Sequence, residues 1–217
     1  MRTAYQGELT RFTGQLSEIL ALAEAAIGRA TTALLEADLA LADEVVVRAP
    51  EIRARHHRLD AEALSLLARQ QPVATDLRTL VAGLRMSVDL ERMGVIARHI
   101  AEIVRQRHPH HVVPACINGT VGAMGAAAKR LAAEARAVLE TNDTEKALEL
   151  AVEDDEIDQL QDALYGQLLD PDTSLDLQTA MNVAQLGRHY ERFADHAVSV
   201  AKRVAFIVRG NQDQPAA

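Results

Sequence analysis

The apolar positions of the chain recur at helical spacing and are interrupted at five places. The interruptions lie near Asp38, around Pro72, across the ten residues from Arg105 to Pro114, near Asn142 and around Pro171. Polar clusters with proline or asparagine end helices. The breaks leave six helices, three on each side of the proline-bounded segment. Because the connections are short, each set predicts an up-down-up bundle of three antiparallel neighbours.

The last helix shows this pattern most clearly. Its small and apolar residues repeat at alternating spacings of three and four, which predicts a heptad-like seam facing the core. The seam consists of Ala180, Val183, Gly187, Tyr190, Ala194, Ala197, Ala201, Val204 and Val208, and it is widened by Leu186, Phe193, Val200 and Ile207. Two local features qualify the helical pattern. Pro50 predicts a kink or break in the second helix, and Asp172, Thr173 or Ser174 is expected to cap the last one.

The two sets of helices are a sequence repeat. With an offset of 105 residues Leu34 matches Leu139, Asp38 matches Asp143, and Glu51 with Ile52 matches Glu156 with Ile157; with an offset of 100, Asp76 and Leu77 match Asp176 and Leu177, and Glu91 and Arg92 match Glu191 and Arg192. The sequence therefore predicts an all-α fold of two tandem three-helix bundles related by pseudo-twofold symmetry. We expect the first repeat at 1–107, a linker at 108–114, the second repeat at 115–210 and a disordered tail at 211–217.

Composition narrows the function. The net charge of −8 disfavours general nucleic-acid binding, which needs a basic surface. The single cysteine, Cys116, excludes an internal disulfide, and we expect it to serve packing. No uncharged run approaches the 18 residues of a membrane-spanning helix, and the charged N-terminus lacks the apolar stretch of a signal peptide. A cytoplasmic protein is expected, with any membrane contact made through partners.

Carboxylates near the fifth and sixth helices form the main candidate site. Glu191 and Asp195 are one turn apart beside the apolar seam, and antiparallel packing about Pro171 brings the fifth helix level with them. The predicted metal ligands are Glu191, Asp195, Asp154 and Asp158. Facing carboxylates repel unless a cation or protons compensate, and hard oxygen ligands suit magnesium, calcium, manganese or iron. The alternative is a solvated acidic surface, with Arg188 and Arg192 as salt-bridge partners.

The equivalent positions of the first repeat do not preserve this set. Glu91 is kept and Glu51 is expected near it, but Arg53 replaces the counterpart of Asp158 and Val95 replaces the counterpart of Asp195. A cation site built from several carboxylates is therefore expected in the second repeat only.

The histidines and the known catalytic motifs add little. His196 points about 100° away from Asp195 on the helix, His56, His57 and His99 are expected to be solvated, and His108, His110 and His111 fall in the linker. The chain has no glycine-rich phosphate loop, no cysteine pair and no His-Glu-x-x-His motif. No catalytic residue is assigned, and an enzyme is not expected.

Two segments resemble a known family. "RQQPVATDLRTLVAGLRMSVDLERMG" in the first repeat and "DLQTAMNVAQLGRHYERFADHAVSVAKRVAFIVRG" in the second are similar to the PhoU family of phosphate-transport regulatory proteins, over about residues 1 to 210. The resemblance implies two tandem three-helix bundles, a cytoplasmic and often dimeric protein, and acidic motifs able to hold metal clusters. It assigns Glu191, Asp195, Asp154 and Asp158 to those motifs.

The same resemblance implies a regulatory function. Members of this family restrain phosphate uptake and the phosphate-starvation genes when phosphate is plentiful. They connect the ATPase subunit of the phosphate ABC transporter with a sensor histidine kinase, so this chain is expected to be an adaptor, and a homodimer. Two alternatives remain open: a metal-dependent, oxidase-like enzyme built on the second-repeat carboxylates, and a helical scaffold without metal.

Overall fold

The structure is a computed structural model that describes residues 2–153, 155–173 and 175–210. Every regular element within these ranges is a helix, which confirms the all-α prediction. The helices are α1 (Arg2–Glu36), α2 (Leu39–Gln70), α3 (Ala74–Arg107), α4 (Asn118–Thr141), α5 (Thr144–Glu153), α6 (Asp155–Leu169) and α7 (Leu177–Arg209). Helices α5 and α6 flank residue 154 and together take the place of the predicted fifth helix.

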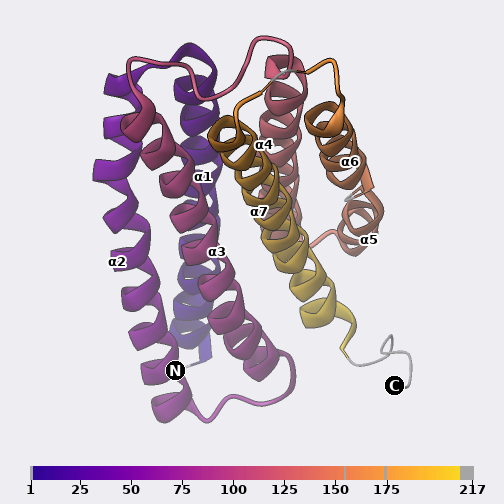
Figure 1. Ribbon diagram of the computed structural model, residues 1–217. Helices are drawn as coiled ribbons and strands as arrows, with labels where there is room; N and C mark the ends of the chain where they lie inside the picture. The colour runs from indigo at the N-terminus through magenta and orange to yellow at the C-terminus, as the bar shows by residue number, and fades with distance from the viewer. Residues whose placement is uncertain (1, 154, 174, 211–217) are drawn as a thin grey trace.

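The helices form two tandem bundles, as the repeat predicts (Figure 1). Helices α1, α2 and α3 pack together, and α4, α5, α6 and α7 form the second bundle. The bundles meet where α3 packs against α7 and α1 packs against α4. Four helices therefore lie in the middle of the molecule, with α2 on one side and α5 and α6 on the other.

The connections agree with the predicted breaks, with two corrections. Asp38 caps α2 by accepting a hydrogen bond from the Leu41 backbone N–H (3.0 Å). Asp176 caps α7 through the Thr179 N–H (2.9 Å), so the prediction that the cap lies at Asp172, Thr173 or Ser174 was wrong. Helix α2 also runs through Pro50 without the break that was one of the two outcomes expected there. The predicted linker 108–114 falls within the connection between α3 and α4, and the tail 211–217 lies outside the described residues.

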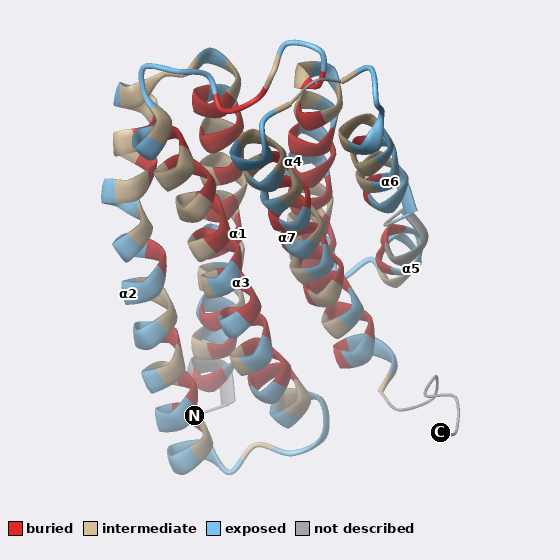
Figure 2. Cartoon of the chain, in the orientation of Figure 1, coloured by how far each residue is buried: buried red, intermediate tan, exposed pale blue. Residues whose placement is uncertain are grey.

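The core is continuous across both bundles (Figure 2). The predicted seam of α7 is buried from Val183 to Val204, but its last member, Val208, is 49% exposed. A close helix approach occurs at Gly125 of α4, where an added Cβ would lie 2.3 Å from Thr31 Cγ2. The Thr31 hydroxyl is 2.9 Å from the buried Tyr190 hydroxyl, so α1 touches α4 and α7 at this point.

None of the helices in the described part of the chain has the length and apolar character that crossing a membrane requires.

Candidate functional site

The structure places three of the four predicted metal ligands on α6 and α7, and Asp154 lies outside the described residues. Asp158 is an exposed residue in the first turn of α6, which packs on α7. On α7, Glu191 is partly buried and Asp195 is exposed. The Glu191 Oε2 atom is buried and has no hydrogen-bond partner. A buried carboxylate oxygen without a partner is costly, so this atom is a candidate ligand atom.

Burial and nearby charges shift the pKa of Glu191. Burial raises the pKa above its ordinary value, and the negative charges of Asp195 and Asp158 raise it further, while Arg188 and Arg192 lower it. Asp195 and Asp158 are therefore close enough to Glu191 for their charges to act on it. The two arginines influence Glu191 through their charge, but they form no ion pair with Glu191 or Asp195 among the described residues, contrary to the salt bridges considered above.

The side chains around Glu191 determine whether a metal ion could bind there. Within the described residues, no three side chains of histidine, cysteine, aspartate or glutamate are arranged to hold a metal ion together. Asp154, the remaining predicted ligand, lies outside the described residues. Glu191 has an unpartnered buried oxygen and feels the charges of Asp158 and Asp195, which are hard oxygen donors by type, but the three are not arranged as a ligand set by themselves.

The first repeat differs at the equivalent positions. Arg53 Nε donates a hydrogen bond to Glu91 Oε1 (3.1 Å), which neutralises the carboxylate matching Glu191. Glu51 accepts hydrogen bonds from Arg55 instead of contributing to a cluster with Glu91. Val95 lines the small hollow beside this ion pair. An arginine thus occupies the place that a cation would need.

A charged network that the sequence did not reveal joins the two repeats. Asp89 of α3 is 8% exposed and lies 3.1 Å through Oδ1 from His196 Nδ1 of α7. Its Oδ2 accepts hydrogen bonds from Ser199 Oγ (3.2 Å) and from Arg203 Nη2 (2.9 Å). Burial alone would raise the pKa of Asp89, but the hydrogen bond from His196 and the charge of Arg203 outweigh it and hold the pKa below its ordinary value. His196 therefore serves the interface between the repeats.

A second polar contact across the same interface involves His99 of α3 and His189 of α7. Their rings are tilted at a centroid distance of 5.7 Å. His189 is 7% exposed, and burial, with help from the charges of His99 and Arg192, lowers its pKa to about 4. The expectation that His99 is solvated was wrong, since it is only partly exposed. His56 was wrongly placed too, because its Nδ1 lies 3.1 Å from Ser87 Oγ in a part-buried contact.

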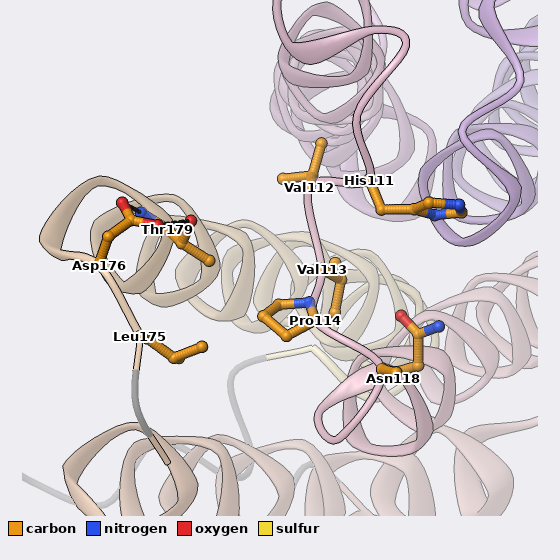
Figure 3. A pocket seen from close by; sticks show the side chains of 9 residues that line it. His111, Val112, Val113, Pro114, Asn118, Leu175, Asp176 and Thr179 are labelled. Atoms are coloured by element: carbon orange, nitrogen blue, oxygen red, sulfur yellow. Dashed lines mark hydrogen bonds between the residues drawn. The ribbon is translucent and has the colours of Figure 1, made fainter.

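The connection between the repeats borders a cavity of about 410 Å³ (Figure 3). Side chains from the connection, from the start of α4 and from the start of α7 line it; those labelled are His111, Val112, Val113, Pro114, Asn118, Leu175, Asp176 and Thr179. Asp176 is engaged in capping α7, and the buried Asn118 Oδ1 has no hydrogen-bond partner. No charged cluster faces the cavity among its lining residues. Nearby, Cys116 is exposed and does not pack in the core as expected.

Comparison with known proteins places these features in a family. The family model described as "PhoU domain" matches residues 16–104 and 121–204, one match in each bundle. A Mycobacterium leprae protein named "Phosphate-specific transport system accessory protein PhoU homolog 1" is 43% identical over 97% of this chain and 95% of its own length. A Mycobacterium tuberculosis protein named "Phosphate-specific transport system accessory protein PhoU homolog 2" is also 43% identical, over 97% of this chain and 99% of its own length.

Solved structures agree with the fold. The crystal structure of PhoU from Pseudomonas aeruginosa superposes with a TM-score of 0.84 at 27% identity, covering 95% of this chain and 99% of the other. The phosphate transport system regulatory protein PhoU from Streptococcus pneumoniae gives a TM-score of 0.87 at 22% identity and covers 97% of this chain and 100% of the other. The likeness therefore extends over both bundles.

Proposed function

Because this chain belongs to the PhoU family, we propose that it regulates phosphate transport, as a negative regulator of phosphate uptake and of the phosphate-starvation genes. The observation that carries this proposal is the match of both bundles to the family model together with relatives, 43% identical over nearly the whole chain, that are named accessory proteins of a phosphate-specific transport system. None of the relatives reported above is named as an enzyme, and we propose a regulatory role without catalysis.

The proposed mechanism is that of an adaptor. The chain would contact the ATPase subunit of the phosphate ABC transporter and a sensor histidine kinase, in the cytoplasm and as a homodimer. Long helices packed into one core give rigid faces of fixed relative orientation. A partner that binds one state of the transporter better than another can pass that state on by shifting which complex is populated.

A metal site in the second repeat is part of the proposal. Glu191, Asp195, Asp158 and Asp154 would hold a divalent or iron-type metal cluster, which would neutralise their mutual repulsion and satisfy the buried Glu191 oxygen. In the first repeat the equivalent carboxylate, Glu91, is already paired with Arg53, and this supports restricting the proposed site to the second repeat. Calorimetry and metal analysis would measure the binding of manganese or ferrous iron to the purified chain. The Glu191→Gln/Asp195→Asn variant should lose this binding. The control variant Glu149→Gln, which changes an exposed carboxylate of α5, should keep it.

The cellular experiment is deletion of the gene in phosphate-rich medium. Phosphate uptake and phosphate-starvation transcripts should both rise, and the intact gene should restore repression. Unchanged uptake and transcripts, in a strain with no second copy, would contradict the regulatory role. An Asp195→Ala strain then asks whether the metal site contributes: retained repression in that strain would separate the adaptor from the metal.

A further inference from the structure

An exposed face runs along α3 and α7 on the outward side of the contact between the bundles (Figure 2). The contacts of Asp89 with His196 and of His99 with His189 show that the two helices are antiparallel. Arg92 lies between the first and second of these contacts along α3, and Arg192 lies between them along α7. The exposed residues of α3 and those of α7 therefore come together near the middle of the interface, at Arg92 and Arg192. We call the following exposed residues the α3–α7 face: Leu77, Val81, Arg85, Val88 and Arg92 with Leu177, Gln178, Met181, Gln185, Arg188 and Arg192.

The arginines of this face lack ion pairs. Arg85, Arg92, Arg188 and Arg192 are exposed and have no salt bridge or hydrogen bond in the described part of the chain. Arg188 and Arg192 act on Glu191 only through their charge. Elsewhere most arginines pair with a carboxylate, for example Arg105 with Asp43 at 2.7 Å and Arg136 with Glu24 at 3.2 Å. Unpaired guanidinium groups remain available to a partner.

The rest of the face is apolar or neutral. Met181 is 60% exposed and Leu177 is 76% exposed, and Val81 and Val88 are exposed on α3. None of the exposed positions of the described helix segments 77–92 and 177–192 holds a carboxylate, and beyond Arg192 the exposed row of α7 continues with Asp195, Lys202 and Phe206. Aliphatic side chains between fixed cations are the composition of a protein-docking surface, since the apolar part supplies burial and the charges supply orientation.

We infer that the α3–α7 face docks a protein partner through an acidic, amphipathic surface, with Arg85, Arg92, Arg188 and Arg192 pairing its carboxylates. Guanidinium groups bind carboxylates in bidentate geometry, which fixes the orientation of the partner. The overall negative charge of the chain opposes binding to nucleic acid, whose affinity depends on neutralising many phosphates. The inference deepens the proposed adaptor function and rests on it for the choice of partners.

The test compares two charge reversals on the face with a matched reversal elsewhere. Arg92→Glu/Arg192→Glu changes the middle of the face, and Arg85→Glu/Arg188→Glu is a second pair at exposed positions. Arg58→Glu is the control, because Arg58 is an exposed arginine of α2 without an ion pair among the described residues. Circular dichroism melts establish that each variant folds.

Binding is measured by interferometry to the purified ATPase subunit, to the cytoplasmic part of the histidine kinase, and to vesicles with anionic phosphatidylglycerol. The wild-type chain should bind one of the proteins, each double reversal should weaken that binding about tenfold or more, and Arg58→Glu should leave it unchanged. Raising the salt from about 50 to about 300 mM should weaken the wild type more than the double reversals.

The outcomes separate the two proposals. If the wild-type chain binds a partner and the double reversals bind it equally well, the docking inference is overturned while the adaptor function stands. Sensitivity to the reversals on vesicles only would assign the face to a membrane and also overturn the inference. If the wild-type chain binds neither protein, the adaptor function fails and the inference fails with it.

Discussion

Asp89 is the residue at which charge holds the two repeats together. It is nearly buried, and its carboxylate accepts hydrogen bonds from Arg203 and Ser199 of the other bundle and lies within hydrogen-bond distance of His196 Nδ1. Asp89→Asn would leave the Arg203 guanidinium without a counter-charge, and we expect a loss of about 2 kcal/mol in the free energy of unfolding, measured with urea at pH 7. Glu91→Gln, which breaks the more exposed ion pair with Arg53, should cost less than about 1 kcal/mol. Equal losses would contradict the network's importance.

The same carboxyl predicts a pH dependence. The folded-state pKa of Asp89 is lowered, so its stabilising effect is present above the unfolded value of about 3.9 and is lost as the pH falls through the folded value. The difference in unfolding free energy between the wild type and Asp89→Asn should therefore be constant above about pH 5 and shrink below about pH 4. A difference that stays constant down to pH 3 would show that Asp89 charge is not the cause.

Tyr190 makes a neutral polar contact between the repeats. It is fully buried and its hydroxyl lies 2.9 Å from Thr31 Oγ1. Tyr190→Phe should reduce the free energy of unfolding by about 1 kcal/mol, because Thr31 keeps its bond to the Ile27 carbonyl and only one buried partner is lost. Tyr165→Phe on α6 is the control, since that side chain is partly exposed and is expected to change stability little.

At the residue scale, the sequence revealed sites whose members are close along the chain. The Glu191 and Asp195 pair is visible because the two residues are one helical turn apart. Asp89 and its partners are 107 to 114 residues apart, so no local pattern connects them. The only signal was a charged residue at a position of α3 surrounded by buried residues, such as Met86, Leu90 and Met93. A helical-wheel reading of α3 alone could have marked Asp89 as a residue that needs a partner.

At the scale of elements, Gly125 allows α4 to approach α1. A Cβ there would lie 2.5 Å from Thr31 Oγ1, and Thr31 is held by Tyr190 and by its own helix. Gly125→Ala should therefore lower the free energy of unfolding by about 2 kcal/mol through overpacking. Gly14→Ala on α1 meets nothing within 4 Å and should raise it by up to about 1 kcal/mol, because alanine favours the helix. A stabilising Gly125→Ala would refute the close approach.

The helices and their order followed from the sequence because strong helix formers and apolar periodicity agree along the chain. The predicted cap of the last helix and a break at Pro50 did not occur, because these details depend on which of several nearby residues or contacts dominates locally. Several residues before α7 can cap a helix, and Asp176 is the one whose carboxylate reaches the Thr179 N–H. Pro50 is tolerated because it removes one hydrogen bond at an exposed position, while burial of Val45, Ile52 and Leu59 stabilises α2 on both sides of it.

At the scale of the whole molecule, the helices that join the two repeats differ from the outer helices. The four helices at the junction of the bundles carry the contacts that join the repeats. The outer helices differ between the repeats: α2 is a continuous helix of 32 residues, whereas α5 and α6 have 10 and 15. Of the proposed metal ligands Asp158 lies on α6 and Glu191 and Asp195 lie on α7, so a bound ion would link these two helices.

Hydrogen exchange should show this difference directly. Among the described side chains α5 buries only Ala147 and Leu150 and α6 only Ile157 and Leu164, while α3 and α7 have buried residues along most of their length. Amides of α5 and α6 should therefore exchange faster than those of α3 and α7, because local opening costs least where few apolar contacts are broken. Added manganese should slow exchange in α6 of the wild type but not of Glu191→Gln/Asp195→Asn. Protection of α6 equal to that of α7 in metal-free protein would show that burial at the junction does not set the local stability.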